Sequence, residues 1–177
     1  MSISFLDITC DVCKFRGSSL ATTGQFLWSH DGQTFQFEQR LGLCLDCNNV
    51  VAIECFPDSQ TMERARLIRT TYTGKPLLRL LEPDYAKYLA SQVGFEVLEK
   101  VLALHRRPVC LECGNSAVRP IVKPEGVNSK TPVSLNLGHP WCAGTLQMQD
   151  SGRLRMSIRP KTSVYSIHGQ LLLRYTE

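Results

Sequence analysis

The sequence predicts an α+β fold in which two β-rich segments, residues 1–57 and 108–177, flank a helical segment, residues 58–107. Three observations support this division. Four short pairs of cysteine or histidine lie in the outer segments, strand-like alternation and turn residues surround these pairs, and a helical apolar period fills the middle. The chain of 177 residues is 43% hydrophobic and 20% charged, so it can bury a core.

The first β-rich segment contains a hairpin signal between its two cysteine pairs. Residues 25–29 and 34–38 alternate between apolar and polar, and the turn between them contains the dipeptide Asp-Gly at Asp31. This dipeptide between alternating runs is typical of a β-hairpin. The apolar run 50–56 then predicts a closing strand, and Cys55 within it is interpreted as a small buried hydrophobe.

The middle segment predicts helices. Asp58 or Ser59 can cap the first helix, and Pro83 suits the first turn of the second. Pro108 ends the last helix. Apolar or aromatic residues recur at helical spacing at Met62, Ala65 and Ile68, at Tyr85, Tyr88 and Leu89, and at Phe95, Leu98, Val101, Leu102 and His105. This stripe either packs on the β-rich segments or forms an exposed helix that binds a partner.

The second β-rich segment repeats the plan of the first more loosely. Strands are expected at residues 117–123 and 133–137. The polar residues 150–152 predict a turn before a strand at 153–159, and a final hairpin is expected around His168.

The cysteine pairs are typical of metal-binding knuckles, because each has two residues between its members. Two such turns can bring four ligands to one tetrahedral ion. Asn48 and Gly114, which follow two of the knuckles, tolerate the positive φ that such a turn needs. The candidate metal ligands are Cys10, Cys13, Cys44, Cys47, Cys110, Cys113, His139 and Cys142.

Spacing along the chain favours pairing the knuckles in sequence. The first site would then be Cys10/Cys13/Cys44/Cys47 and the second Cys110/Cys113/His139/Cys142, each within a zinc ribbon. A cross-braced arrangement, with the first knuckle paired with the third, is the rival. Two structural Zn²⁺ ions are expected, although ligand type alone leaves a rubredoxin-like iron open at the four-cysteine site. Eight ligands for two ions leave no open position for catalysis.

Candidate contact residues lie mainly on a basic strand face. In the strand predicted at 153–159, Leu154, Met156 and Ile158 face one way. Arg153, Arg155 and Arg159 face the other way, and Lys161 follows the strand. These residues could contact nucleic-acid phosphates or form a solvated face. Phe26, Trp28, Phe35 and Phe37 could stack on bases, but their alternation favours core packing. Trp141, inside a knuckle, is a better contact candidate.

The remaining chemistry is sparse. A redox role for the CxxC pairs would need a thioredoxin-like strand-to-helix setting, which is missing, and no phosphate-binding loop or nucleophile elbow is present, so no small-molecule substrate is indicated. The net charge of +4 is weak support for nucleic-acid binding. No secretory signal and no run of roughly 20 apolar residues is found, so a cytoplasmic protein without a membrane span is expected.

Several motifs resemble a family of uncharacterised bacterial double zinc-ribbon proteins. The resemblance is carried by residues 41–48, 51–56, 106–114, 139–146 and 164–172. It implies the metal sites and the fold but no activity. The leading functional hypothesis is a non-catalytic, zinc-binding adaptor that binds another protein. The alternative is an accessory protein that binds DNA or RNA through the basic strand face, and an enzyme, redox or otherwise, comes third.

Overall fold

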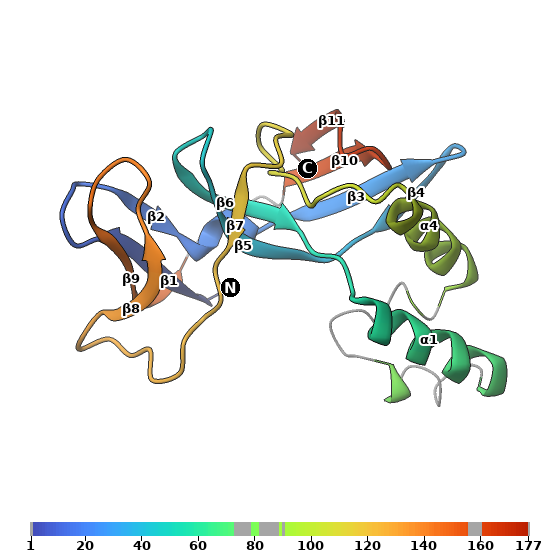
Figure 1. The fold of residues 1–177 in the computed structure, drawn as a ribbon, viewed down its shortest axis with the longest axis horizontal. Helices are drawn as coiled ribbons and strands as arrows, with labels where there is room; N and C mark the ends of the chain where they lie inside the picture. The colour runs from blue at the N-terminus through green and yellow to red at the C-terminus, as the bar shows by residue number, and fades with distance from the viewer. Residues whose placement is uncertain (1, 73–78, 82–88, 90, 156–160, 177) are drawn as a thin grey trace.

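The computed structural model describes residues 2–72, 79–81, 89, 91–155 and 161–176, and its fold is α+β as expected. Three β-sheets and two helices, α1 and α4, make up this described part, together with the short 3-10 helix η1 at Ser19–Thr22. Figure 1 shows one sheet at one end of the molecule and the helices at the other. No helix in the described ranges is long and apolar enough to cross a membrane.

The first sheet joins the N-terminal strand to the long strand near the C-terminal end. Its strand order is β2 (Arg16–Ser18), β1 (Ser2–Cys10), β9 (Thr145–Arg155) and β8 (Val133–Gly138). The expected turn at 150–152 is wrong, because β9 continues through these residues. Ser4 pairs with Arg153 and Leu6 with Asp150, so β9 takes up its extra residue in an irregularity of bulge type, where Gly152 has a φ of +84°.

The second sheet contains both predicted hairpins. Its strand order is β11 (Leu171–Thr176), β10 (Lys161–Ser166), β3 (Gln25–His30) and β4 (Gln33–Gln36). Asp31 and Gly32 both have positive φ in the β3–β4 turn, which confirms the Asp-Gly hairpin. Gly169 has a φ of +85° in the β10–β11 turn. β10 runs parallel to β3, so the two hairpins share one sheet.

The third sheet has the order β6 (Asn49–Glu54), β5 (Gln39–Cys44) and β7 (Val118–Pro120). The strands predicted at 50–56 and 117–123 are therefore confirmed in part, over residues 50–54 and 118–120. Every sheet pairs a strand from residues 1–57 with one from 108–177. The expectation that each β-rich segment folds as its own ribbon is thus not confirmed.

The helices pack on the second sheet. Asp58 caps α1 (Ser59–Thr71) by accepting a hydrogen bond from the Thr61 N–H, and Ser91 caps α4 (Gln92–Ala103) in the same way through Gly94. Apolar side chains of both helices share a core with those of β3 and β10: Phe26, Trp28, Met62, Ala65, Phe95, Leu98, Val101 and Tyr165. The packed interpretation of the helical stripe is confirmed for these residues. The helix expected at Pro83 to Tyr88 lies outside the described residues.

A buried ion pair connects the end of the helical segment to the third sheet. The carboxylate of Glu54 is fully buried at the end of β6. It accepts hydrogen bonds from both terminal nitrogens of Arg106, from Trp28 Nε1 at 3.1 Å and from the Val109 N–H at 3.2 Å. Because all these donors converge on one carboxylate, Glu54 fixes the chain between α4 and the third knuckle.

Candidate metal centres

All eight predicted ligands lie in two compact clusters. Centre 1 consists of Cys10, Cys13, His139 and Cys142, and centre 2 consists of Cys44, Cys47, Cys110 and Cys113. Within each cluster the candidate ligand atoms lie within 4.8 Å of one another. Zn–S bonds of about 2.3 Å place tetrahedral sulfurs under 4 Å apart. The sulfur separations of 3.4, 3.7 and 3.9 Å match this spacing, so each cluster can surround one ion.

The pairing of the knuckles predicted from spacing is wrong. The structure joins the first knuckle to the fourth and the second to the third, so neither the sequential nor the cross-braced arrangement is present. Strand pairing explains this nested order. β1 and β9 are neighbours, with Cys10 opposite Leu146, so Cys10 lies beside the knuckle that precedes β9.

Centre 2 follows the same logic in the third sheet. Cys44 pairs with Val118 of β7, and the Leu45 N–H donates to the Ala117 carbonyl at 2.9 Å. Ile53 of β6 forms a bridge with Cys110. The second and third knuckles are therefore brought together by strands that are distant in the sequence.

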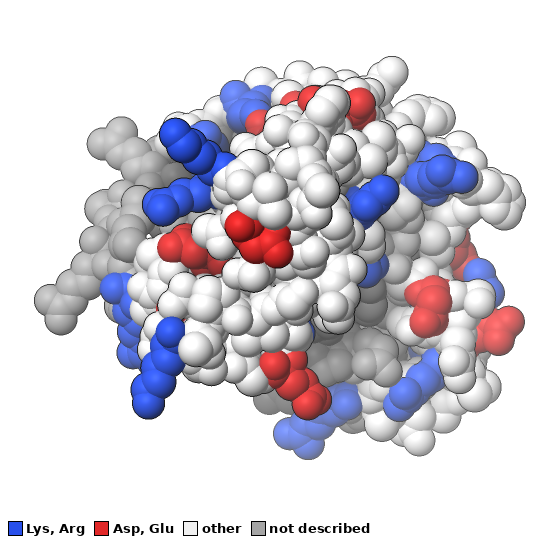
Figure 2. All heavy atoms as spheres, turned by 60° about the vertical axis from the view of Figure 1, so that its left-hand side comes forward, with Lys and Arg blue, Asp and Glu red and all other residues white. Residues whose placement is uncertain are grey.

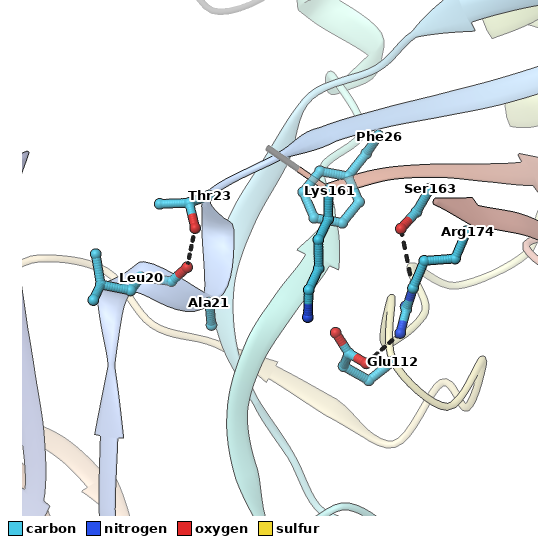
Figure 3. A pocket seen from close by; sticks show the side chains of 8 residues that line it. All are labelled: Leu20, Ala21, Thr23, Phe26, Glu112, Lys161, Ser163 and Arg174. Carbon is cyan, nitrogen blue, oxygen red and sulfur yellow. Dashed lines mark hydrogen bonds and ion pairs between the residues drawn. The ribbon is translucent and has the colours of Figure 1, made fainter. Parts of the chain in front are cut away.

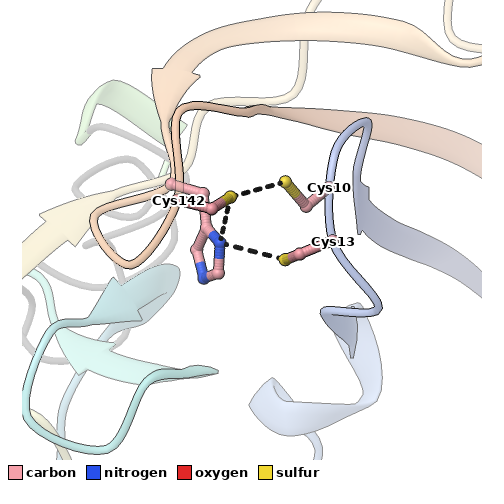
Figure 4. Close-up of side chains that lie close together, drawn as sticks. Cys10, Cys13 and Cys142 are labelled. Atoms are coloured by element: carbon pink, nitrogen blue, oxygen red, sulfur yellow. Dashed lines mark hydrogen bonds between the residues drawn. The ribbon is translucent and has the colours of Figure 1, made fainter.

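Centre 1 has a compact arrangement of three sulfurs and one ring nitrogen. The Sγ atoms of Cys10 and Cys142 are 3.4 Å apart, and His139 Nδ1 lies 3.3 Å from Cys13 Sγ and 3.2 Å from Cys142 Sγ. Figure 4 shows the three cysteine side chains turned toward one another. Gly144 closes the cluster on one side, where an added Cβ would lie 2.4 Å from Cys10 Sγ. No larger residue fits at this position without displacing a ligand.

The ring of His139 is oriented by a residue from the other centre's knuckle. Its Nε2 lies 3.0 Å from Asn48 Oδ1, while Nδ1 faces the sulfurs. With Nδ1 as the metal ligand, Nε2 carries the proton and donates to Asn48, an orientation typical of metal-bound histidine. Phe15 packs against the ring at 4.6 Å between centroids. Asn48 directly follows Cys47 and thereby connects the two centres.

Replacing Asn48 with alanine should weaken metal binding at centre 1 by about 10- to 100-fold, because the His139 ring loses its partner. Asn48 has a φ of +46°, so Asn48→Gly is the matched control for the backbone effect of the substitution. Competition with a chromophoric chelator measures the affinity. If Asn48→Ala and Asn48→Gly bind metal as tightly as the original chain, the hydrogen bond to His139 does not position the ligand.

Centre 2 consists of sulfur ligands alone. Cys44 Sγ lies 3.7 Å from Cys113 Sγ, and Cys47 Sγ lies 3.9 Å from Cys110 Sγ. The backbone N–H groups of Cys47 and Glu112 point at Cys44 and Cys110 sulfurs at 3.4 Å each, which stabilises negative charge there. Asn48 and Gly114 have φ of +46° and +79°, as expected after tight knuckles.

The cluster thiols differ in how strongly they hold their protons when no metal is bound. At Cys10 and Cys113 burial raises the pKa, but hydrogen bonds from the backbone and from neighbouring thiols outweigh it, so the pKa is lowered. Three other thiols hold their protons more strongly than a free thiol. Burial raises the pKa of Cys110 to about 12. At Cys142 a hydrogen bond from the Gly144 N–H lowers the pKa, but burial and the neighbouring Cys10 and Cys13 thiols outweigh it and raise the pKa to about 11. Burial likewise raises the pKa of Cys47. Since the thiolate is the metal ligand, each of these groups must lose a proton on binding.

Metal affinity should therefore rise with pH across the neutral range. Thiols with raised pKa values are protonated at pH 7, so the metal competes with protons, and lowering the pH favours the metal-free chain. We expect the apparent affinity to increase by about tenfold per pH unit for each proton released, between about pH 6 and pH 8. A chelator competition series at several pH values tests this. A flat series would mean that the thiols are already ionised.

Both clusters are closed sites. Each offers four ligand atoms, which completes the tetrahedron that structural zinc adopts, whereas a catalytic zinc keeps a position for water or substrate. The donor sets, three sulfurs with one imidazole and four sulfurs, fit a structural ion.

The expected nucleic-acid contacts that the structure describes lie on strands of two different sheets. Arg153 is exposed on β9 in the first sheet, where Arg155 is the last residue, while Lys161 begins β10 in the second sheet. Arg159 lies outside the described residues. Figure 2 shows one face on which Lys and Arg are interspersed with Asp and Glu. The contacts predicted for these basic residues stay a prediction.

The aromatic residues follow the core interpretation. Phe26, Trp28 and Phe37 are buried, and Phe35 packs partly buried against the same core. Their faces are therefore not open to stacked bases. Trp141 lies 64% exposed on the fourth knuckle, in keeping with its selection as a contact candidate.

Some features of these sites were not predicted from the sequence. Asn48 was selected for its turn geometry, and its contact with His139 arises only from the nested pairing. A cavity beside β10 and β11 was also missed, because its lining residues come from distant segments. No family model matches the chain, and no curated protein or solved structure matches it.

Proposed function

We propose that the chain is a non-catalytic adaptor that binds another protein and is held together by one structural zinc ion in each centre. The closed geometry of both clusters supports a structural role, because all four positions of each tetrahedron are taken by the protein. The imidazole at centre 1 favours zinc there. At centre 2, metal analysis separates zinc from iron, since a ferric tetrathiolate is coloured and a zinc one is not.

The observation that carries protein binding is the exposed tryptophan at centre 1. Trp141 lies on the fourth knuckle, and Val12, on the first knuckle, is also exposed. The two knuckles hold the same cluster, so a metal ion would fix both apolar side chains on a rigid base. Tryptophan is enriched among residues that dominate protein–protein affinity, and its large area contributes most when a partner covers it.

Affinity capture of the zinc-loaded chain from a bacterial extract, with and without nuclease, tests this function. We expect to capture a protein partner whether or not nuclease is added. The Trp141→Ala chain should no longer capture this partner, and the Leu67→Ala chain should still capture it. Leu67 is the matched control because it is equally apolar and exposed but lies on α1. The captured partner should then bind the purified chain in a two-component titration.

Two results would contradict the adaptor function. Capture that disappears with nuclease, and weakens with Arg153→Ala, would favour the nucleic-acid alternative. Capture that persists in Trp141→Ala and Leu67→Ala alike would remove the knuckle surface as the binding site. Circular dichroism of each variant controls for folding.

A further inference from the structure

We propose that the free edge of β11 takes up an extended strand of the partner protein and that the cavity beside β11 receives an acidic side chain of that strand. This inference rests on the proposed adaptor function and names the chemistry of a partner. It uses a surface that is separate from Trp141, so the two proposals can fail independently.

β11 lies at the outer edge of the second sheet. In the described part of the chain it pairs only with β10, so its outward row of backbone N–H and C=O groups is unpaired. Such a row is a ready template for a strand from another chain. β11 spans Leu171–Thr176, which is long enough for a partner strand of about six residues.

The exposed side chains of β11 are unusual for an edge strand. Leu172 and Leu173 are 57% and 55% exposed, and Leu171 and Tyr175 are 44% and 42% exposed. Proteins normally protect edges with charges, proline or short strands. Two of the other edge strands follow that rule: β4 is four residues long and carries Gln33, Thr34 and Gln36, and β7 is three residues long with Arg119 and Pro120. β11 departs from it.

A cationic cavity of about 180 Å³ lies beside β11 on the face of the sheet that carries Ser163 and Arg174. Leu173 and Tyr175 alternate with Arg174 and face the other side. Lys161 of β10 and Arg174 of β11 line it together with Glu112 of the third knuckle and the buried ring of Phe26. Arg174 donates to Glu112 Oε2 at 2.8 Å, to the Leu111 carbonyl at 2.9 Å and to Ser163 Oγ at 3.1 Å. Figure 3 shows Lys161 and Arg174 extending toward Glu112 from neighbouring strands.

The charges of this cavity favour one carboxylate from the partner. Two cations face one acidic side chain, and Lys161 has no ion pair among the described residues. A glutamate or aspartate on the added strand would supply the missing negative charge and form a charge-assisted hydrogen bond to Lys161. Residues next to this acid would point to the other face, where Leu173 and Tyr175 lie opposite Val164 and Thr162. The partner strand should therefore alternate apolar and acidic residues.

A second copy of this chain fits the edge less well. Antiparallel self-pairing about Leu173 would place Arg174 of each copy one position from the two-fold axis. The positively charged cavities of the two copies would then lie along one shared edge. Like charges close together across strands are destabilising. Charge complementarity thus selects a different chain over a second copy.

Peptide display on the zinc-loaded full chain tests the inference. We expect enriched peptides in which acidic residues alternate with apolar ones. The best synthetic peptide should bind at least tenfold more weakly to Leu173→Lys and to Lys161→Glu. Binding to Lys161→Arg and to Gln36→Lys, which alters the opposite edge, should stay within about twofold. Hydrogen exchange should show the amides of residues 171–176 protected in the complex.

Three outcomes would overturn the inference. They are the absence of any enriched alternating peptide, peptide binding without protection at β11, and a dimer in sedimentation that Leu173→Lys dissociates. The Trp141→Ala chain distinguishes the two proposals, because it should lose partner capture yet still bind the selected peptide. If instead capture depends on Trp141 and no peptide is selected, the adaptor function stands and the β11 inference fails.

Discussion

A chain carrying both Cys13→Ser and Cys142→Ser should bind one metal ion, whereas a chain carrying Cys13→Ser and Cys47→Ser should bind none tightly. The reason is the nested pairing: the first double substitution damages centre 1 alone, and the second damages both centres. Metal content after equilibration with a competing chelator measures the difference. Cys55→Ser is the control, since Cys55 lies outside both clusters, and it should retain two ions.

The opposite pattern would restore the sequential pairing. If Cys13 and Cys47 shared a site, their joint loss would remove one ion and the Cys13/Cys142 pair would remove both. The same experiment reports on stability. Each structural zinc contributes on the order of 10–16 kcal/mol of apparent binding free energy, which exceeds the net stability of about 5–15 kcal/mol of a typical domain. Complete chelation should therefore unfold the chain, and circular dichroism that stays unchanged after verified metal loss would contradict this.

Replacing Glu54 with alanine should destabilise the fold by about 3–5 kcal/mol, the second largest effect that we expect. The substitution leaves the guanidinium of Arg106 without the carboxylate that it pairs with in the protein interior. It also removes the acceptor of the hydrogen bonds from Trp28 Nε1 and the Val109 N–H. Urea unfolding of the zinc-loaded chain measures the change in free energy.

The matched control is Glu99→Ala, which breaks an ion pair with Arg66 on the surface of the helices. Exposed pairs of this kind contribute at most about 1 kcal/mol, so this variant should unfold close to the original chain. If Glu54→Ala and Glu99→Ala lower the free energy of unfolding by equal amounts, the buried pair of Glu54 contributes no more to stability than an exposed pair.

Local features were predicted well because they depend on neighbours in the sequence. The Asp31 turn, the capping by Asp58 and the eight candidate ligands each follow from a few adjacent residues, and the structure contains all of them. The cysteine spacing likewise predicted the knuckles themselves.

Non-local features were predicted poorly. Which knuckles share a metal depends on the pairing of β1 with β9 and of β5 with β7, and no short-range pattern encodes those partners. The turn predicted at residues 150–152 failed for a related reason. Asp150, Ser151 and Gly152 are turn formers, but pairing with β1 extends the strand through them, and Gly152 supplies the positive φ of the irregularity.

The nested pairing also sets when the protein can acquire metal during its synthesis. The first knuckle emerges from the ribosome well before its co-ligands His139 and Cys142, which are synthesised after all four residues of centre 2. Centre 2 has all of its ligands earlier, as soon as Cys113 leaves the exit tunnel. A chain interrupted before Cys142 therefore has unligated thiols at Cys10 and Cys13, so metal occupancy of centre 1 requires synthesis at least through Cys142.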